Sequence, residues 1–283
     1  ALAALVKYAH SQARLSEPLP SSSHTSSSKI RQVLTNFLKH HQDTSDEWLP
    51  PEVLEEILSA YQIPLPPSSL ARSPEEAVKI AWQFGLEQSP WGVVLKVVSP
   101  DILHKSDVGG VLLNLKDAPA VERGFEQILH NVRSAHPEAE VQGVLVQPVI
   151  PPGQEVIIGA VRDAQFGPLV MFGSGGVEVE GLKDIAFALA PLDYQDIEYL
   201  LENTWAGRKL RGYRNLPPAD RRAVVDILSR LSQMAWDFPE IAEVEINPLR
   251  VLRENMGAVA LDVRLKVKTP DQDAGDYLSP QSL

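Results

Sequence analysis

The stretch Val93–Leu115, VVLKVVSPDILHKSDVGGVLLNL, decides how the rest of this sequence is interpreted. It contains two apolar runs on either side of a polar loop. The first run, Val93–Val98, is crowded with β-branched residues, which favours a buried β-strand. Lys96 lies inside that run, and an ammonium group in such a place needs an anionic partner. The sequence therefore predicts that Lys96 meets an anion, either a ligand or a carboxylate of the protein.

The polar loop between the two runs carries a histidine, a lysine and a glycine pair. His104 is followed by Lys105, and Gly109 and Gly110 precede the second apolar run. Glycines let backbone N–H groups approach a ligand closely. An imidazole that accepts a phosphoryl group needs cations or N–H donors nearby to stabilise the developing charge. The loop is therefore a candidate phosphate site, against the commoner alternative of an ordinary surface histidine.

Length and composition indicate the class of protein. A chain of 283 residues favours two packed lobes, and 44% hydrophobic with 22% charged residues is usual for a globular protein. The net charge of −11 disfavours a nucleic-acid partner, because phosphates repel an acidic surface. The sequence has no cysteine, which excludes disulfides and thiolate sites. It shows neither a bilayer-spanning run nor a signal peptide, so we expect no membrane association and a cytoplasmic location.

Apolar periodicity and turn signals predict an α/β (α+β) architecture. Helices are expected at Pro51–Tyr61, at 73–85 with Ser73 as N-cap, at Val121–Val132 and at Pro218–Phe238. Strands are expected at Val93–Val98, Gly143–Ile150, Glu155–Val161 and Pro168–Phe172, and the segments Val244–Val251 and Ala258–Lys266 are expected to form a hairpin. Helices and strands that alternate along a chain are typical of α/β proteins.

Changes in composition suggest the domain boundaries. Residues 1–17 resemble the end of a helix from a preceding domain, and the Ser/Pro-rich residues 18–47 are expected to form a flexible linker with a short helix at Ile30–Lys39. Two lobes are expected at 48–150 and 151–268, with the PPGQ segment as a hinge between them. The tail, 269–283, is expected to be disordered.

The C-terminal hairpin gathers polar side chains on one face. Successive residues of a strand point to opposite faces. One face of the first strand carries Glu243, Glu245 and Asn247, and its other face carries Val244 and Ile246. The partner strand has Asp262 and Arg264 on the polar face and Val259, Leu261, Val263 and Leu265 on the apolar face. Hard oxygen ligands on a rigid strand pair suit a Mg²⁺ ion that substrate phosphates also hold. A solvated polar face is the alternative.

Two further features have plain alternatives. The glycine cluster GSGG at 173–176 follows a strand, as in loops whose N–H groups contact phosphate, but no Gly-Lys-Ser/Thr follows it, so it is not a P-loop. A basic patch is formed by Arg208, Lys209, Arg211 and Arg214. Such a patch is most often a solvated surface, with a docking surface as the alternative.

The loop, the segment Gly153–Glu180 and the motif EVEINPL at Glu243–Leu249 together resemble the ATP-grasp part of the NDP-forming acyl-CoA synthetases. The resemblance covers Trp48–Val267. It implies two lobes that clamp ATP or ADP with Mg²⁺ between them. The family usually has glycine where this chain has Gln62, and Arg-Gly where it has Arg214 and Asn215.

The resemblance also implies roles for individual residues. His104 would relay phosphate, and Glu245 matches a catalytic carboxylate near a phosphohistidine. The nucleotide would be bound by Lys96, Lys105, Gly109, Gly110, Gln147, Val149 and Glu155, where Gln147–Val149 border the adenine and Glu155 points toward the ribose. Mg²⁺ would be held by Asn247 and Asp262.

The implied activity is the reversible conversion of acyl-CoA, ADP and phosphate to a carboxylic acid, ATP and CoA. This chain would carry the step between His104 and ADP, as part of an oligomer with a CoA-ligase domain in the same chain or in a partner subunit. One alternative is a non-catalytic nucleotide or CoA sensor fused to an acetyltransferase. Another is an ATP-grasp carboxylate ligase of a different branch, which would leave His104 without a role.

Overall fold

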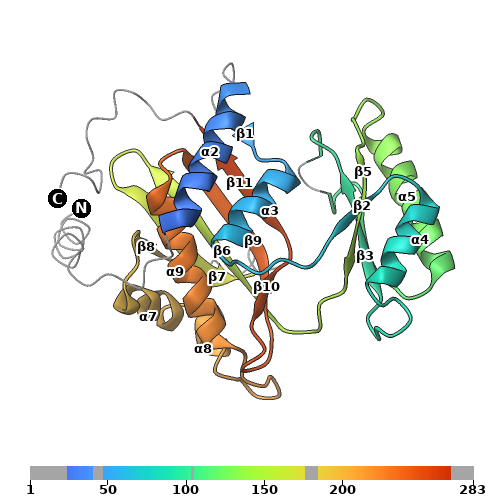
Figure 1. The fold of residues 1–283 in the computed structure, drawn as a ribbon. Helices are drawn as coiled ribbons and strands as arrows, with labels where there is room; N and C mark the ends of the chain where they lie inside the picture. The colour runs from blue at the N-terminus through green and yellow to red at the C-terminus, as the bar shows by residue number, and fades with distance from the viewer. Residues whose placement is uncertain (1–23, 41–46, 103–104, 176–183, 269–283) are drawn as a thin grey trace. The chain divides into compact units, whose positions relative to one another are not determined.

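The computed structural model describes residues 24–40, 47–102, 105–175 and 184–268 (Figure 1). The chain divides into two compact units. Unit 2 is Pro66–Pro152, and unit 1 consists of the residues on either side of it. Residues 48–65, which the sequence analysis grouped with the first lobe, belong to unit 1. Leu49, Ile57 and Ile63 from that segment lie in the same core as strand residues such as Val156 and Ile246.

Unit 2 is a four-stranded sheet with two helices on one of its faces (Figure 1). The strands lie in the order β2 (Ser69–Ala71), β5 (Gly143–Pro148), β3 (Val93–Val98) and β4 (Val111–Leu115), and all neighbours are antiparallel. The helices are α4 (Pro74–Gln83) and α5 (Ala118–Ala135). The predicted N-cap is confirmed, because the Ser73 hydroxyl accepts a hydrogen bond from the Glu76 N–H group at 3.2 Å.

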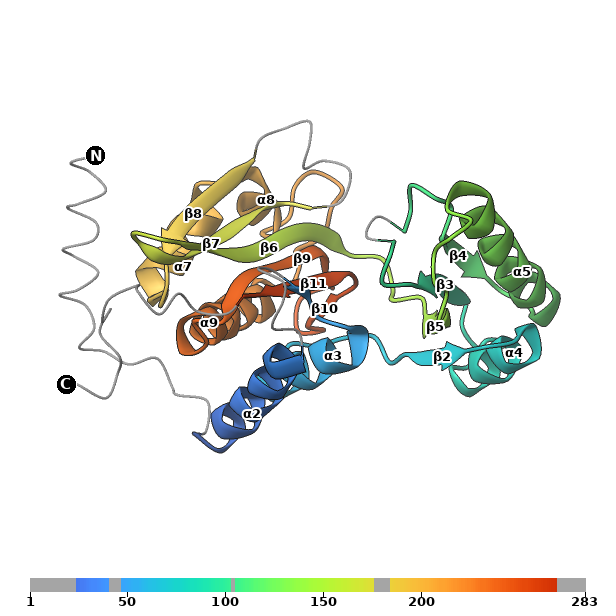
Figure 2. The same ribbon diagram turned by 90° about the horizontal axis from the view of Figure 1, so that it is seen from above.

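Unit 1 is built on a seven-stranded sheet (Figure 2). Its main path is β1 (Glu47–Trp48), β11 (Val263–Val267), β9 (Ile241–Val251), β6 (Gln154–Asp163), β7 (Gly167–Ser174) and β8 (Ile185–Leu189), while β10 (Ala258–Ala260) pairs with β9. The helices are α2 (His24–His40), α3 (Pro51–Ala60), α7 (Tyr194–Glu202), α8 (Trp205–Lys209) and α9 (Arg221–Asp237). None of the helices in the described part of the chain has the length and the apolar run that a membrane crossing would need.

The helix α2 corrects the expectation of a flexible linker at 18–47. The short helix expected at Ile30–Lys39 is present, but it begins at His24 and ends at His40. Its side chains Ile30 and Leu34 are each 1% exposed and belong to the core of unit 1. Residues four apart share one face of a helix, so these two and the partly buried Leu38 form one apolar stripe. That stripe supplies the apolar burial that the neighbouring serines lack.

Four described elements of unit 1 were not expected from the sequence, namely β1, β8, α7 and α8. The start of α7 nevertheless has a readable signal. Asp193 accepts a hydrogen bond from the Asp196 N–H group at 2.8 Å, and the Asp196 carboxylate accepts one from the Asp193 N–H group at 3.2 Å. This reciprocal pair is a capping box, here with Asp in place of the usual Glu or Gln at its second position.

The C-terminal hairpin is confirmed, with one correction. Both β10 and β11 pair antiparallel with β9. The prediction for Val259 is wrong, because Ala258 and Ala260 are the buried residues of β10. In β11 the buried residues are Leu265 and Val267, so the buried side changes phase between the two strands. The change lies at Leu261, whose N–H group donates to the Pro248 carbonyl at 3.0 Å. Because Pro248 has no N–H group, it cannot donate a hydrogen bond back to the opposite strand.

The end of α3 explains the family's preference for glycine at position 62. The Gln62 N–H group donates to the Ser59 carbonyl, and the Ile63 N–H group donates to the Leu58 carbonyl, both at 2.9 Å. This is the Schellman arrangement, which requires a left-handed residue after the helix cap. Gln62 has a φ of 52°, a conformation that costs any residue with a Cβ atom some free energy.

Gln62→Gly should therefore stabilise the protein by about 0.5–1 kcal/mol, because glycine adopts the left-handed conformation without strain. Urea unfolding monitored by circular dichroism measures the difference. The matched control is Ser59→Gly, an exposed position inside the same helix, which should destabilise by about 0.5 kcal/mol. A loss of stability in Gln62→Gly would contradict this account of the helix end.

Candidate functional site

In unit 2, Lys96 lies on the face of the sheet that α4 and α5 do not cover. Its neighbours Leu95 and Val97 belong to the core beneath those helices. Because side chains alternate along a strand, Lys96 points to the opposite side. It is half-buried, whereas the other residues of β3 are buried. The predicted buried strand is thus confirmed, and its one charged residue faces the open side of the sheet.

Gln147 and Val149 lie on the same open face as Lys96. In the ladder between β3 and β5, Leu145 is opposite Lys96 and Gln147 is opposite Val94. Lys96 and Gln147 are therefore diagonal neighbours on one face. The Val149 N–H group donates to the Gly92 carbonyl at 3.0 Å, which continues the pairing beyond β5. The three predicted site residues therefore lie on one face of the sheet.

The described part of the loop, 105–110, forms a closed turn. The Gly110 N–H group donates to the Lys105 carbonyl at 2.7 Å, and the Gly109 N–H group donates to the Ser106 carbonyl at 3.1 Å. Both N–H groups are therefore already engaged within the loop, which differs from the expectation that they point at a ligand. Lys105 is half-buried. His104 lies outside the described residues.

In unit 1, Asn247 of β9 lies opposite Asp262, which stands in the short break between β10 and β11. The Asn247 N–H group donates to the Asp262 carbonyl at 3.0 Å. Asp262 is half-buried and precedes Val263, which packs against the core. Ile246, the neighbour of Asn247 in β9, is buried in the core, so the Asn247 side chain points to the other face. Glu245 belongs to that face as well and is opposite Arg264 in the ladder. The two strands predicted from alternation are therefore paired in the register that places Asn247 beside Asp262.

These residues fit a Mg²⁺ site that is completed by phosphate oxygens. Asn247 and Asp262 offer an amide oxygen and a carboxylate, and both residues are half-buried on a rigid strand pair. Within the described ranges, no group of three or more His, Asp or Glu side chains is placed to hold a metal. Mg²⁺ commonly binds through one or two carboxylates together with substrate phosphates. A site with two protein ligands agrees with this mode of Mg²⁺ coordination.

Glu155 has a partner within the protein. The Arg250 guanidinium donates to the Glu155 carboxylate at 2.5 Å, and the two residues face each other across β6 and β9. Both side chains are partly exposed, at 23% for Arg250 and 34% for Glu155. A ribose hydroxyl would therefore meet a carboxylate that an arginine already holds in place.

The described residues of the GSGG cluster are held by Asp184. The Ser174 hydroxyl donates to the Asp184 carboxylate at 2.8 Å, and the Ser174 N–H group donates to the Asp184 carbonyl at 3.1 Å. The same carboxylate accepts bonds from the N–H groups of Trp205 at 2.7 Å and Ala206 at 2.8 Å, at the start of α8. Burial alone would raise the pKa of Asp184, but these donors outweigh burial and lower it. The carboxylates Glu178 and Glu180 lie outside the described residues.

Two arginines of the basic patch contact Glu202 of α7, and Arg221, which is outside the patch, binds Glu198 of the same helix. Arg221 binds Glu198 through two hydrogen bonds of 2.8 and 2.7 Å, and this pairing raises the pKa of Arg221 and lowers that of Glu198. Arg211 pairs with the Glu202 carboxylate, and Arg208 donates to the Glu202 carbonyl at 2.9 Å. These contacts match a solvated, ion-paired surface.

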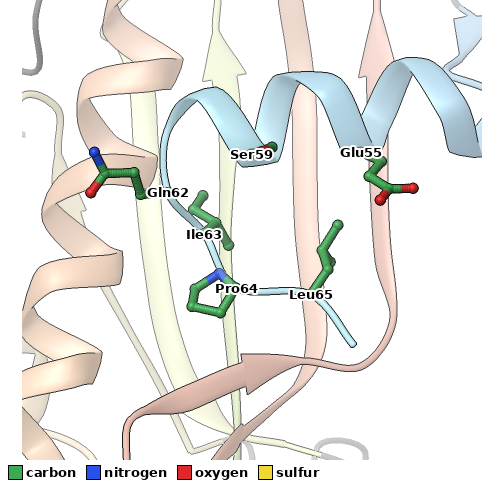
Figure 3. Close-up of a pocket in the computed structure, with 6 residues that line it drawn as sticks. All are labelled: Glu55, Ser59, Gln62, Ile63, Pro64 and Leu65. Atoms are coloured by element: carbon green, nitrogen blue, oxygen red, sulfur yellow. The ribbon is translucent and has the colours of Figure 1, made fainter. Parts of the chain in front are cut away.

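A hollow of about 350 Å³ lies at the end of α3 (Figure 3). It is lined by Glu55, Ser59, Gln62, Ile63, Pro64 and Leu65. All of these residues come from α3 and the segment that follows it, and none is a predicted site residue. The Gln62 carbonyl accepts a hydrogen bond from Arg230 at 2.6 Å. The hollow thus belongs to the helix end and not to the polar sheet face.

A family model for the ATP-grasp domain matches residues 40–267. This chain belongs to the ATP-grasp family. It is 41% identical to the beta subunit of acetate–CoA ligase [ADP-forming] I of Pyrococcus furiosus, over 75% of this chain and 88% of the relative. It is 44% identical to acetate–CoA ligase [ADP-forming] I of Archaeoglobus fulgidus, over 74% of this chain. The chain spans only 29% of the length of that second relative. Both relatives are ADP-forming CoA ligases.

Solved structures agree with the family. Acetyl-coenzyme A synthetase 1 of Candidatus Korarchaeum cryptofilum, in complex with coenzyme A, Ca-AMPCP and HgCl⁺, is 39% identical and superposes with a TM-score of 0.74. The match covers 83% of this chain and 99% of that one. A second structure of that enzyme holds coenzyme A and Mg-AMPPCP, with its phosphohistidine segment pointing towards the nucleotide-binding site. That structure is 36% identical, with a TM-score of 0.69, over 84% of this chain and all of the other. The ATP-grasp fold of this chain follows from these matches.

Replacing Asp184 by Asn in this ATP-grasp chain should destabilise it by about 1 kcal/mol at neutral pH, the usual cost of a lost helix cap. The pKa of Asp184 is lowered in the folded state, so its stabilising effect is full above the unfolded pKa and is lost as the pH falls through the folded pKa. The difference between the two proteins should therefore shrink in acid. Thermal unfolding from neutral to acidic pH measures it. Ser174→Ala removes one of the donors that lower the pKa of Asp184, so its smaller cost should also shrink in acid. A pH-independent difference between Asp184→Asn and wild type would contradict the assignment.

Proposed function

We propose that this chain is the nucleotide-binding module of an ADP-forming acyl-CoA synthetase, in which it transfers phosphate between His104 and an adenine nucleotide with the help of Mg²⁺. The observation that carries the proposal is the backbone hydrogen bond that sets Asn247 of β9 opposite Asp262, at the break between β10 and β11. Two oxygen ligands on one face are what a phosphate-bound Mg²⁺ ion requires. Membership of a family with ADP-forming CoA ligases supports the same reaction class.

Each polar face has a separate task in this proposal. In unit 1, Asn247 and Asp262 would hold Mg²⁺. Glu245 lies two residues from Asn247 on the same side of β9. When bound, Mg²⁺ neutralises charge on the phosphate oxygens and orients them. On the open face of unit 2, Lys96 would bind a phosphate oxygen, and Gln147 and Val149 would border the adenine.

The phosphate transfer is a simple exchange of bonds. A nitrogen of the His104 imidazole attacks the terminal phosphorus of ATP, and an N–P bond forms as the bond from phosphorus to the bridging oxygen breaks, which releases ADP. In the other direction, an oxygen of ADP attacks the phosphorus and the imidazole leaves. Lys96 and Lys105 supply positive charge to the phosphate oxygens in either direction. Glu155, held by Arg250, would accept a hydrogen bond from the ribose.

The remaining chemistry belongs to a CoA-ligase part, which we propose to be present in the same chain or in a partner subunit of an oligomer. The relatives occur in both forms, as a beta subunit and as a chain of which this one spans 29%. That part would form the acyl-CoA and would exchange phosphate with His104. The proposed net reaction converts acyl-CoA, ADP and phosphate to a carboxylic acid, ATP and CoA.

Incubating the protein with γ-labelled ATP and Mg²⁺ should place acid-labile, base-stable phosphate on His104. His104→Asn should abolish the label while nucleotide binding, measured by calorimetry, persists. The matched control is His130→Asn, an exposed histidine of α5, which should keep the label. Equal labelling of His104→Asn and wild type would overturn the relay. Nucleotide binding by a wild-type protein that takes up no label would favour a sensor.

Substituting either proposed metal ligand should raise the Mg²⁺ concentration that phosphorylation requires. Asp262→Asn should have the larger effect, at least tenfold, because it removes a formal charge from a divalent-cation site. Asn247→Ala should follow, and binding of nucleotide without metal should change little. Glu243→Gln, on the same face four residues from Asn247, is the control and should leave the requirement unchanged. Superimposable Mg²⁺ titrations of wild type and both variants would show that the metal site is wrong.

A further inference from the structure

The turn at 105–110 is fixed to the sheet at one end. The Gly110 carbonyl accepts a hydrogen bond from the Val97 N–H group of β3 at 2.8 Å, and the Gly110 N–H group closes the turn on the Lys105 carbonyl at 2.7 Å. These two bonds connect Lys105 with β3 through a single residue. The Gly110 N–H group and the Gly109 carbonyl belong to one planar peptide unit, so the carbonyl points away from the turn, where another group binds it.

That other group is the side chain of Asn131 on α5. Its Nδ2 atom donates to the Gly109 carbonyl at 3.1 Å, across 22 positions of sequence. Asn131 is half-buried, at the edge of an apolar helix face that includes Ile128 and Val132. A short polar side chain in such a place has few partners to choose from, so the bond to Gly109 fixes both groups.

Close packing of α5 on the sheet makes this contact possible. A Cβ atom added at Gly124 would lie 3.0 Å from Leu115 Cδ1 and 3.3 Å from Leu95 Cδ1. The helix therefore approaches β3 and β4 closely at Gly124. Asn131 is seven residues further on, which is two helical turns and the same side of the helix. The small residue at 124 thus brings the amide at 131 within reach of the loop.

Gly109 and Asn131 are fitted to each other. Gly109 has a φ of 62°, and a Cβ atom there would lie 2.7 Å from Asn131 Nδ2. The position therefore needs glycine for its backbone conformation and for the space that the amide occupies. The sequence analysis attributed the glycine pair to ligand contact. In the structure, Gly109 instead contacts Asn131 of the protein itself.

We propose that Asn131 is a positioning residue for phosphate transfer, which fixes the turn at 105–110 and with it the place of Lys105. This inference rests on the proposed function. Asn131 touches no substrate in it and acts through the Gly109 peptide. The neutral amide is the suitable group, because an aspartate of the same shape would set an anionic oxygen against the Gly109 carbonyl oxygen.

The test compares Asn131→Asp with Ser134→Ala in the full protein. Ser134 is exposed on the same helix, and among its described partners its hydroxyl donates only to the His130 carbonyl, at 2.9 Å. Removing this hydroxyl alters the helix but leaves the hydrogen bond to the loop intact. Asn131→Asp should slow phosphorylation by γ-labelled ATP at least tenfold at saturating nucleotide, with the nucleotide Kd changed less than threefold. Hydrogen exchange of peptides covering 105–110 should rise at least fivefold, and that of α5 should not. Ser134→Ala should match wild type in every measurement.

Each result decides the proposal. An Asn131→Asp protein with wild-type phosphorylation and wild-type loop exchange would overturn it, as would an equal rise in exchange throughout α5, which would mean general unfolding. If the wild-type protein takes up no label, the proposed function fails. The exchange comparison then still decides whether Asn131 holds the loop, because that measurement does not depend on turnover.

Discussion

The register of β9 is the constraint on which unit 1 depends. This strand pairs with β6 on one side and with β10 and β11 on the other. Its residues Val244 and Ile246 are buried, so Glu245 and Asn247 must face the other way. A slip of one residue would exchange the two faces and bury the carboxylate. The apolar core therefore holds the polar face in place, and no contact among the polar residues themselves is needed to align them.

The same alternation explains what could be predicted from the sequence. Glu243–Asn247 was assigned to a strand with the correct sides, because one buried face leaves a period of two in the sequence. Val93–Val98 was assigned to a buried strand from its β-branched residues. Prediction failed where that period is interrupted. Pro248 breaks the ladder, so the buried side of β10 differs from that of β11 and Val259 was assigned to the wrong face. The expected linker failed for a related reason, because Ile30 and Leu34 are too few for a periodicity to outweigh the serines around them.

Contacts between residues that are far apart in the chain could not be predicted from the sequence. The glycines at 109 and 110 and the serine at 174 look like phosphate-binding residues when only their neighbours are considered. Their N–H groups are engaged within the protein, and the partner of Ser174, Asp184, carries no sign of this in its own surroundings. The pairing of Glu155 with Arg250 joins residues 95 positions apart. Such partners are fixed by sheet register and packing, which a local pattern does not contain.

The arrangement of the two units along the chain has a consequence for how the protein is made. Unit 2 is a continuous segment, whereas unit 1 needs residues from both sides of it. Its core joins Ile57 and Leu58 to Val244 and Leu265, and these last residues leave the ribosome only after the whole of unit 2. Domains tend to fold as units while the chain is still being made. Unit 2 is therefore synthesised in full before the strands that bury the apolar stripes of α2 and α3. Those stripes stay exposed until the later strands have been made.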